Sequence, residues 1–313
     1  MKNSLAEILN NVVKLLEDQV HHVNTLPAQQ HDTTLFMTED ELFHSLFIHY
    51  EQPTRDVGKI LKLLNEFEAS SQAQAQELLS CNEFTWWMES AHPKSLFVLG
   101  NFWLPGSSMI SPLSILCATL ALSLHMNARS IVLHFFCGLH QHGNDPVGGP
   151  TGLIQSLIAQ LILSGSQFDM SFINTHSFKD DIRSHSLKEL CSTFRELIEQ
   201  LPPTVTVICM LDSITSFESK TWEAQWVDVI NILDNIVRNE RLRPIFKIII
   251  TTSFMRSGFT GDRMKIDHLV RLQPNVVGGE RMSIGVTPRP WRSMEGYRQR
   301  MARADESDDD SDY

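Results

Sequence analysis

Short, continuous apolar runs alternate with helix-like patterns through the middle of this 313-residue chain. The predicted strands are 95–99, 130–137, 204–211, 245–252 and 268–272. The predicted helices between them are 112–125, 151–163, 187–201 and 222–237. Because a strand without polar alternation is buried on both faces, helices must cover both sides of the sheet. The pattern therefore predicts a three-layer α/β domain built on a parallel sheet.

The character of the sequence changes on either side of this core. Residues 1–92 carry helical spacing and form a predicted helical N-terminal region, and residues 93–274 form the α/β domain. Residues 275–313 are Arg-rich and then acidic, and we expect them to be a disordered tail. Within the N-terminal region, Thr38 followed by Glu41 is a capping-box pattern, which predicts the start of a helix.

The distribution of charge weighs against nucleic-acid binding. The formal net charge is −11. Residues 281–303 hold six Arg and one Glu, and residues 305–313 hold six acidic residues, so these two segments nearly cancel. About −10 therefore lies on residues 1–280. Because a body that acidic lacks the basic surface needed to neutralise phosphates, we expect a protein partner and no nucleic acid.

Cysteine usage and hydropathy indicate an intracellular protein. The five Cys are widely spaced, lie mostly within apolar runs and form no C-x-x-C pair, which is typical of reduced, buried thiols. The longest apolar stretch, 112–124, is shorter than the roughly 20 residues that span a bilayer. The N-terminus lacks the continuous apolar segment of a secretory signal. We therefore predict a cytoplasmic protein without a membrane span.

The first predicted strand ends at Gly100, in a segment with some features of a phosphate-binding loop. Such a loop has the pattern G-x-x-x-x-G-K-[ST], in which backbone N–H groups and the Lys hold the phosphates and the hydroxyl binds Mg²⁺. Here five residues instead of four separate Gly100 from Gly106, Ser107 stands at the Lys position, and Ser108 supplies the hydroxyl. The segment is either an atypical nucleotide-binding loop or a plain connection between a strand and a helix.

Two further strand ends would complete such a site, because ligands of open parallel sheets bind beyond the carboxyl ends of the strands. One strand ends at Asp212, which could orient Mg²⁺ or could be an ordinary surface or helix-capping acid. Glu218 is the next carboxylate along the chain, and another strand ends at the polar Thr252. The catalytic residues stay unknown, and Ser108 and Asp212 would be Mg²⁺ ligands only if nucleotide binds. The candidate nucleotide-binding residues are Gly100, Gly106, Ser107, Ser108, Asp212 and Thr252.

Two other clusters have simple structural explanations. His134, Cys137 and two further His lie within nine residues, but strand alternation places His134 and Cys137 on opposite faces, so we expect a packed Cys and loop histidines instead of a zinc site. The glycines at 148–152 could hold an anion at a helix start, although we expect a turn with Thr151 as the N-cap. The motifs G-x-S-x-G, H-E-x-x-H and G-x-G-x-x-G are absent, so other common enzyme classes have no support.

In combination, these elements resemble the NTPase core of the NACHT-type signal-transduction P-loop ATPases. They are more closely similar to the nephrocystin-3-like N-terminal domains that are abundant in fungi. The resemblance spans about residues 86–272 and rests on the order of elements more than on identity. It is carried by 86–88, 96–100, 133–137, 153–161, 207–212 and 246–253. It implies a P-loop NTPase-like domain with strand order 5-1-4-3-2, in which 207–212 is the Walker B strand.

The chain departs from this family at positions that carry charge. Ser107 replaces the Walker A Lys, Thr215 or Ser216 replaces the second acid after the Walker B Asp, and Phe254 replaces the Arg of a Thr-Ser-Arg sequence. Each missing charge would stabilise phosphoryl transfer by on the order of several kcal/mol. We therefore expect a degenerate domain that acts as a non-catalytic interaction or regulatory module without a cofactor. The alternative is an atypical nucleotide-binding protein that uses ATP and Mg²⁺ and hydrolyses ATP or GTP weakly.

Overall fold

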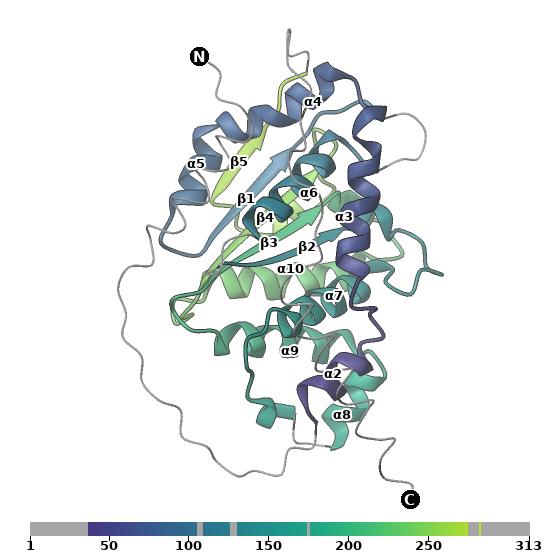
Figure 1. Cartoon of the computed structure of the whole chain (residues 1–313), viewed down its shortest axis with the longest axis vertical. Coiled ribbons are helices and arrows are strands. Elements are labelled where there is room, and N and C mark those ends of the chain that lie inside the picture. Colours follow the sequence, from purple (N-terminus) through teal and green to yellow (C-terminus); the bar gives the residue numbers. More distant parts are fainter. Residues whose placement is uncertain (1–36, 105–108, 126–129, 174–175, 275–281, 283–313) are drawn as a thin grey trace, which may run out of the picture.

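The computed structural model describes residues 37–104, 109–125, 130–173, 176–274 and 282. Its centre is a five-stranded parallel sheet with the order β2-β3-β4-β1-β5 (Figure 1). The strands are β1 (Lys94–Leu99), β2 (Ser130–Phe136), β3 (Thr206–Asp212), β4 (Ile245–Thr252) and β5 (His268–Arg271). All the predicted strands are confirmed, and their order is the one that the family resemblance implies.

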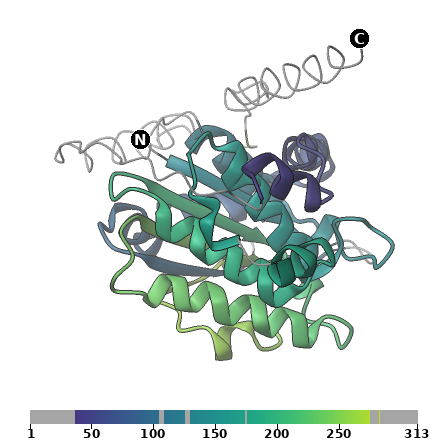
Figure 2. The ribbon, with the colours of Figure 1, turned by 90° about the horizontal axis from the view of Figure 1, so that it is seen from below.

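Helices cover both faces of the sheet and complete the three layers, so the predicted α/β architecture is confirmed (Figure 1 and Figure 2). Alternate residues of β1 separate the two layers, since Phe97 belongs to one buried cluster and Leu96 to the other. The helices of the first layer are α7 (Gly149–Leu163), α9 (Leu187–Gln200) and α10 (Glu223–Arg238). Those of the second layer are α3 (Gln52–Lys62), α4 (Ala69–Gln76), α5 (Asn82–Glu89) and α6 (Pro112–Leu124).

Several shorter helices lie between these elements along the chain. The predicted helix start at Thr38 is confirmed, because the Thr38 N–H donates to Glu41 Oε2 at 2.8 Å and the Glu41 N–H donates to Thr38 Oγ1 at 3.1 Å. None of the helices within the described ranges is long and apolar enough to cross a bilayer. The short helices are α2 (Glu39–Ser45), α8 (His176–Arg183), α11 (Thr260–Arg263), η1 (Leu63–Glu66), η2 (Glu77–Ser80), η3 (Cys137–Leu139), η4 (Met170–Ile173) and η5 (Ile214–Ser216).

The start of α7 differs from the prediction. Gly148 is the N-cap and the helix begins at Gly149, so the assignment of Thr151 as the N-cap is wrong. The Gly149 N–H donates to the His140 carbonyl at 3.0 Å, which closes the preceding loop. Gly149 has a φ of 74°, a left-handed conformation that favours glycine, and a Cβ there would lie 2.6 Å from the Trp222 ring. Closure of the loop therefore sets the helix start.

Lys247 is a fully buried cation at the start of β4, where its ammonium group donates to the Met88 carbonyl. Burial lowers its pKa to about 8 from a usual value of 10.5. The charged form therefore costs stability at neutral pH and below, and this cost disappears only above pH 10.5. We expect Lys247→Met to raise the free energy of unfolding by about 1–2 kcal/mol at pH 7. Urea denaturation at pH 7 and 10 checks this, with Lys62→Met as an exposed control. A loss of stability at pH 7 would contradict it.

Candidate functional site

The carboxyl ends of β1, β3 and β4 meet at one edge of the sheet, where the sequence placed the candidate site. Gly100 follows β1, Asp212 ends β3 and Thr252 ends β4. The Gly100 N–H donates to the Thr252 carbonyl at 2.8 Å, and Asp212 reaches β4 through a hydrogen bond from Thr251. The structure thus brings together three of the predicted residues. The other three, Gly106, Ser107 and Ser108, lie outside the described residues.

An aromatic ring fills the turn after β1. A Cβ at Gly100 would lie 2.6 Å from Cδ2 of Phe102, so the ring packs directly on the Gly100 backbone. Phe102 is buried, and its N–H donates to the Ser253 carbonyl at 2.8 Å. In a phosphate loop the N–H groups of this turn face the ligand. Here the N–H groups of Gly100 and Phe102 are bonded to the end of β4.

At the start of α6, side chains of the helix and of its N-cap already bond the N–H groups. The Ser111 hydroxyl accepts from the Leu113 N–H at 3.2 Å, and the Ser111 N–H donates to Ser114 Oγ at 3.1 Å. Pro112, the first helical residue, has no N–H. A helix binds phosphate through the free N–H groups of its first turn. At this helix those groups are already hydrogen-bonded or absent.

The hydroxyl that reaches Asp212 from α6 belongs to Ser114. In the pattern G-K-[ST] the Lys immediately precedes the residue whose hydroxyl binds Mg²⁺. In α6 that preceding residue is Leu113, which is fully buried, and residues 100–114 contain no Lys or Arg. The place where phosphates would lie therefore has no cation from this segment.

Asp212 is almost completely buried, and both of its oxygens are hydrogen-bonded. The Thr251 hydroxyl donates to Oδ1 at 2.6 Å, and Ser213 Oγ lies 3.0 Å from Oδ2 and 2.7 Å from the Met109 carbonyl. A hydroxyl has one proton and a carbonyl can only accept, so both Ser213 contacts are satisfied when Asp212 is protonated and donates to Ser213. Burial raises the pKa of Asp212, and hydrogen bonds from Ser114 and Thr251 offset this only in part.

Met109 and Ile110 lie over these strand ends. The Met109 carbonyl accepts from the hydroxyls of Ser213, at 2.7 Å, and Ser253, at 3.3 Å. A Cβ on Gly138 would lie 3.0 Å from Ile110 Cδ1 and 3.1 Å from Met109 Cβ. This short segment therefore contacts the residues that follow β2, β3 and β4.

Glu218, the next acid after the end of β3, has a structural role. Its carboxylate accepts from the Ser257 hydroxyl, from the Gly258 N–H at 2.5 Å and from the Thr260 N–H at 2.9 Å. Burial acts to raise the pKa of Glu218, but these hydrogen bonds lower it on balance. Because it already accepts several hydrogen bonds, Glu218 is poorly placed to activate a water molecule.

His140 forms a buried ionic bridge that the sequence did not predict. Its Nε2 lies 2.8 Å from Asp56 of α3, and its Nδ1 lies 2.8 Å from Asp145. Because both ring nitrogens face carboxylate oxygens, both donate and the ring is cationic. Burial alone would lower the pKa of His140, but the two carboxylates raise it above 6.5. Among the residues that the structure describes, no cluster of His, Cys, Asp and Glu is arranged to hold a metal.

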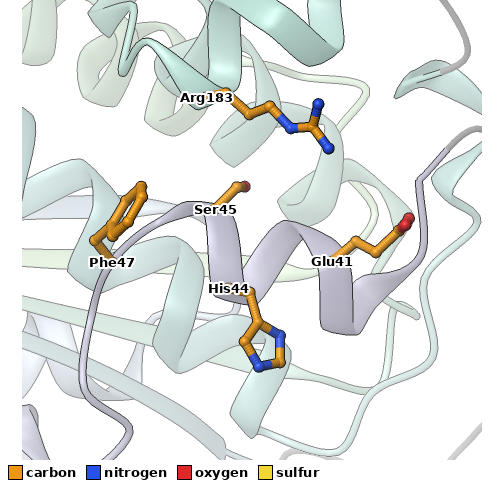
Figure 3. A pocket seen from close by; sticks show the side chains of 5 residues that line it. All are labelled: Glu41, His44, Ser45, Phe47 and Arg183. Carbon is orange, nitrogen blue, oxygen red and sulfur yellow. The ribbon is translucent and has the colours of Figure 1, made fainter.

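A hollow of about 430 Å³ lies elsewhere, between α2 and α8 (Figure 3). Arg183 and Ser45 face one another across it, whereas His44 points the other way. Phe47 borders it with 72% of its surface exposed. The hollow lies toward the opposite end of the molecule from α4, and it contains none of the predicted site residues (Figure 1).

A family model described as "Nephrocystin 3, N-terminal" matches residues 73–253, more than half of the chain. The chain belongs to the nephrocystin 3 N-terminal family. The matched region begins in α4 and ends just beyond β4, so it contains the three strand ends and the start of α6. No curated protein is significantly similar to this family member.

The solved structure of Drosophila ORC bound to AT-rich DNA and Cdc6 contains a chain with distant similarity to this nephrocystin 3 N-terminal family member. The two chains are 13% identical, and the TM-score is 0.36. The match covers 81% of this chain and 36% of that chain, so this chain spans little more than a third of its length. A similarity this low supports no conclusion about function.

Proposed function

We propose that this nephrocystin 3 N-terminal domain does not hydrolyse nucleotide and acts as a non-catalytic interaction or regulatory module. The observation that carries the proposal is the start of α6, where Leu113 precedes the hydroxyl that contacts Asp212. A bound triphosphate needs a cation and free N–H groups at this point. Since the N–H groups are engaged by Ser111, Ser114 and β4, the described residues do not fit ATP.

The state of Asp212 supports the same conclusion. Mg²⁺ takes oxygen ligands that are usually ionised or part of its own water shell. Asp212 is 1% exposed and hydrogen-bonded to Thr251 and Ser213, and burial raises its pKa. To bind a metal, the carboxyl group would have to give up these hydrogen bonds and become accessible. The described residues therefore do not fit Mg²⁺ either.

Isothermal titration with Mg·ATP and Mg·GTP tests the proposal on the full chain. We expect no binding, no turnover above background and no nucleotide released when the purified protein is denatured. Binding tighter than about 100 μM, which corresponds to roughly 5.5 kcal/mol, would instead support an atypical nucleotide-binding protein.

Asp212→Asn separates a buried structural acid from a metal ligand. A raised pKa means that the contribution of Asp212 to stability is full below pH 3.8 and is lost as pH rises through its folded-state value. We therefore expect Asp212→Asn to raise the free energy of unfolding by about 1 kcal/mol at pH 7.5 and to have no effect near pH 3.5, by urea denaturation. The exposed Asp262→Asn is the matched control. A destabilised variant that has also lost Mg·ATP binding would overturn this interpretation.

A further inference from the structure

Met282 returns to the N-terminal helices after the chain has left β5. Its side chain is 4% exposed and belongs to the buried cluster of the α6 layer. Its N–H donates to Gln72 Oε1 in α4 at 2.9 Å, a contact between residues 210 positions apart in the sequence. A single residue of the C-terminal region is therefore held by both its backbone and its side chain.

Gln72 is arranged to receive this backbone. It is 1% exposed, and its Nε2 donates to the carbonyls of Leu64 and Phe67, each at 2.9 Å. These two bonds fix the plane of the amide and therefore the direction of Oε1, which accepts from the Met282 N–H. Without that donor a buried acceptor would be left unpaired, which is unfavourable. Leu64 and Phe67 also pack, partly buried, against the cluster that contains Met282. We call Gln72, Leu64 and Phe67 the Gln72 slot.

The same helix, α4, also contacts the candidate site. Two residues after Gln72, the Gln74 Nε2 donates to the carbonyl of Gly100 at 2.8 Å and to that of Asn101 at 3.3 Å. Figure 1 shows α4 at the end of the sheet where β1 and β5 terminate. With eight residues, α4 is too short to be stable alone, so its order depends on its contacts. The contacts that Met282 makes with α4 therefore also affect the order of the turn after β1, against which Phe102 packs.

We propose that the Gln72 slot is a docking site for a peptide segment and that its ligand is the segment around Met282 of this chain. An unbranched, flexible Met side chain suits such an irregular apolar site, and Gln72 accepts a hydrogen bond from the backbone N–H of the same residue. Docking anchors the C-terminal region to α4 and, through Gln74, holds the turn at Gly100 and Asn101. Release of Met282 loosens both. This regulation goes beyond the proposed function.

The full-length Met282→Asp variant tests the slot, because a buried charge there disfavours docking. A fluorescein-labelled synthetic peptide of residues 277–287 should bind the variant at least about tenfold more tightly than the unmodified chain, whose slot is occupied. The same peptide carrying Asp in place of Met should not bind the variant. Equal binding to both proteins, or binding to neither, would overturn the proposal.

Hydrogen exchange provides a second, independent readout. In Met282→Asp, residues 69–76 and 100–102 should exchange about tenfold faster or more, and the added peptide should restore their protection. Met294→Asp, the same change at another Met of the C-terminal region, should leave this exchange unaltered. Unchanged exchange in Met282→Asp would contradict the coupling through Gln74. Because neither measurement involves nucleotide, failure here is distinct from failure of the proposed function.

Discussion

Asp56→Ala should lower the free energy of unfolding by about 3–5 kcal/mol, because it leaves a buried cation with one of its two partners missing. Asp56 is 5% exposed in α3, and His140 is 2% exposed after β2. The side chain of Gln52 and that of Lys59 also bond to Asp56, so the substitution removes the centre of a small polar network. Urea denaturation at pH 6 measures the loss.

The adjacent residue offers a matched control. Arg55 pairs with Glu51 at 2.8 Å, but both side chains are accessible to solvent, and exposed pairs contribute little. Arg55→Ala should therefore change the free energy of unfolding by less than about 1 kcal/mol. If Asp56→Ala cost no more than Arg55→Ala, His140 would not be a buried cation.

The pH dependence of this bridge has a defined sign. The raised pKa of His140 makes its contribution complete below pH 6.5 and lost as pH rises through its folded-state value. On balance the hydrogen bond and charge of His140 outweigh burial and lower the pKa of Asp56, so its contribution is present above pH 3.8 and lost at lower pH. His125 and His134, whose pKa values burial lowers to about 4, act in the opposite sense in acid. His125 and His134 are present in both wild type and His140→Asn, so their effects cancel in the difference between the two free energies of unfolding. That difference should therefore shrink between pH 6 and pH 9.

The sheet was predictable because burial on both faces leaves an unmistakable pattern. In 245–250 Lys247 is the only polar residue, and the structure buries nearly all of β4. The start of α6 was predictable too, since Ser111 followed by Pro112 is typical of a helix start. The hydroxyl of the candidate site was placed differently: the spacing from Gly100 indicated Ser108, whereas the hydroxyl that contacts Asp212 in the structure belongs to Ser114 in the first turn of this helix.

The rest of the site depends on contacts that no local pattern records. Asp56 and His140 are 84 positions apart, and their bridge exists only because α3 packs beside the end of β2. The raised pKa of Asp212 follows from its burial, which its place at the end of a strand does not reveal. Spacing along the chain therefore located the strand ends, whereas tertiary packing determines what the residues there can do.

Phe102→Ala should lower the free energy of unfolding by about 3–5 kcal/mol, because the ring is buried against Gly100 and its loss leaves a cavity at the strand ends. The next residue is the matched control. Trp103 is 87% exposed, so Trp103→Ala should change the free energy of unfolding by less than about 0.5 kcal/mol. Urea denaturation of the two variants measures the difference. A residue at this position of an open phosphate loop would face the ligand and tolerate truncation as well as Trp103 does.

Nucleotide addition makes the comparison decisive. A ligand that binds only the folded state, present at about 100 times its Kd, stabilises that state by about 2.7 kcal/mol. If Phe102 merely blocked a working site, its removal would uncover that site and excess Mg·ATP would recover most of the lost stability. We expect no recovery, because truncating Phe102 supplies neither a cation beside Ser114 nor free N–H groups at Ser111 and Leu113. Recovery by Mg·ATP would show that the ring gates a nucleotide site, whereas its absence means that the ring is part of the core.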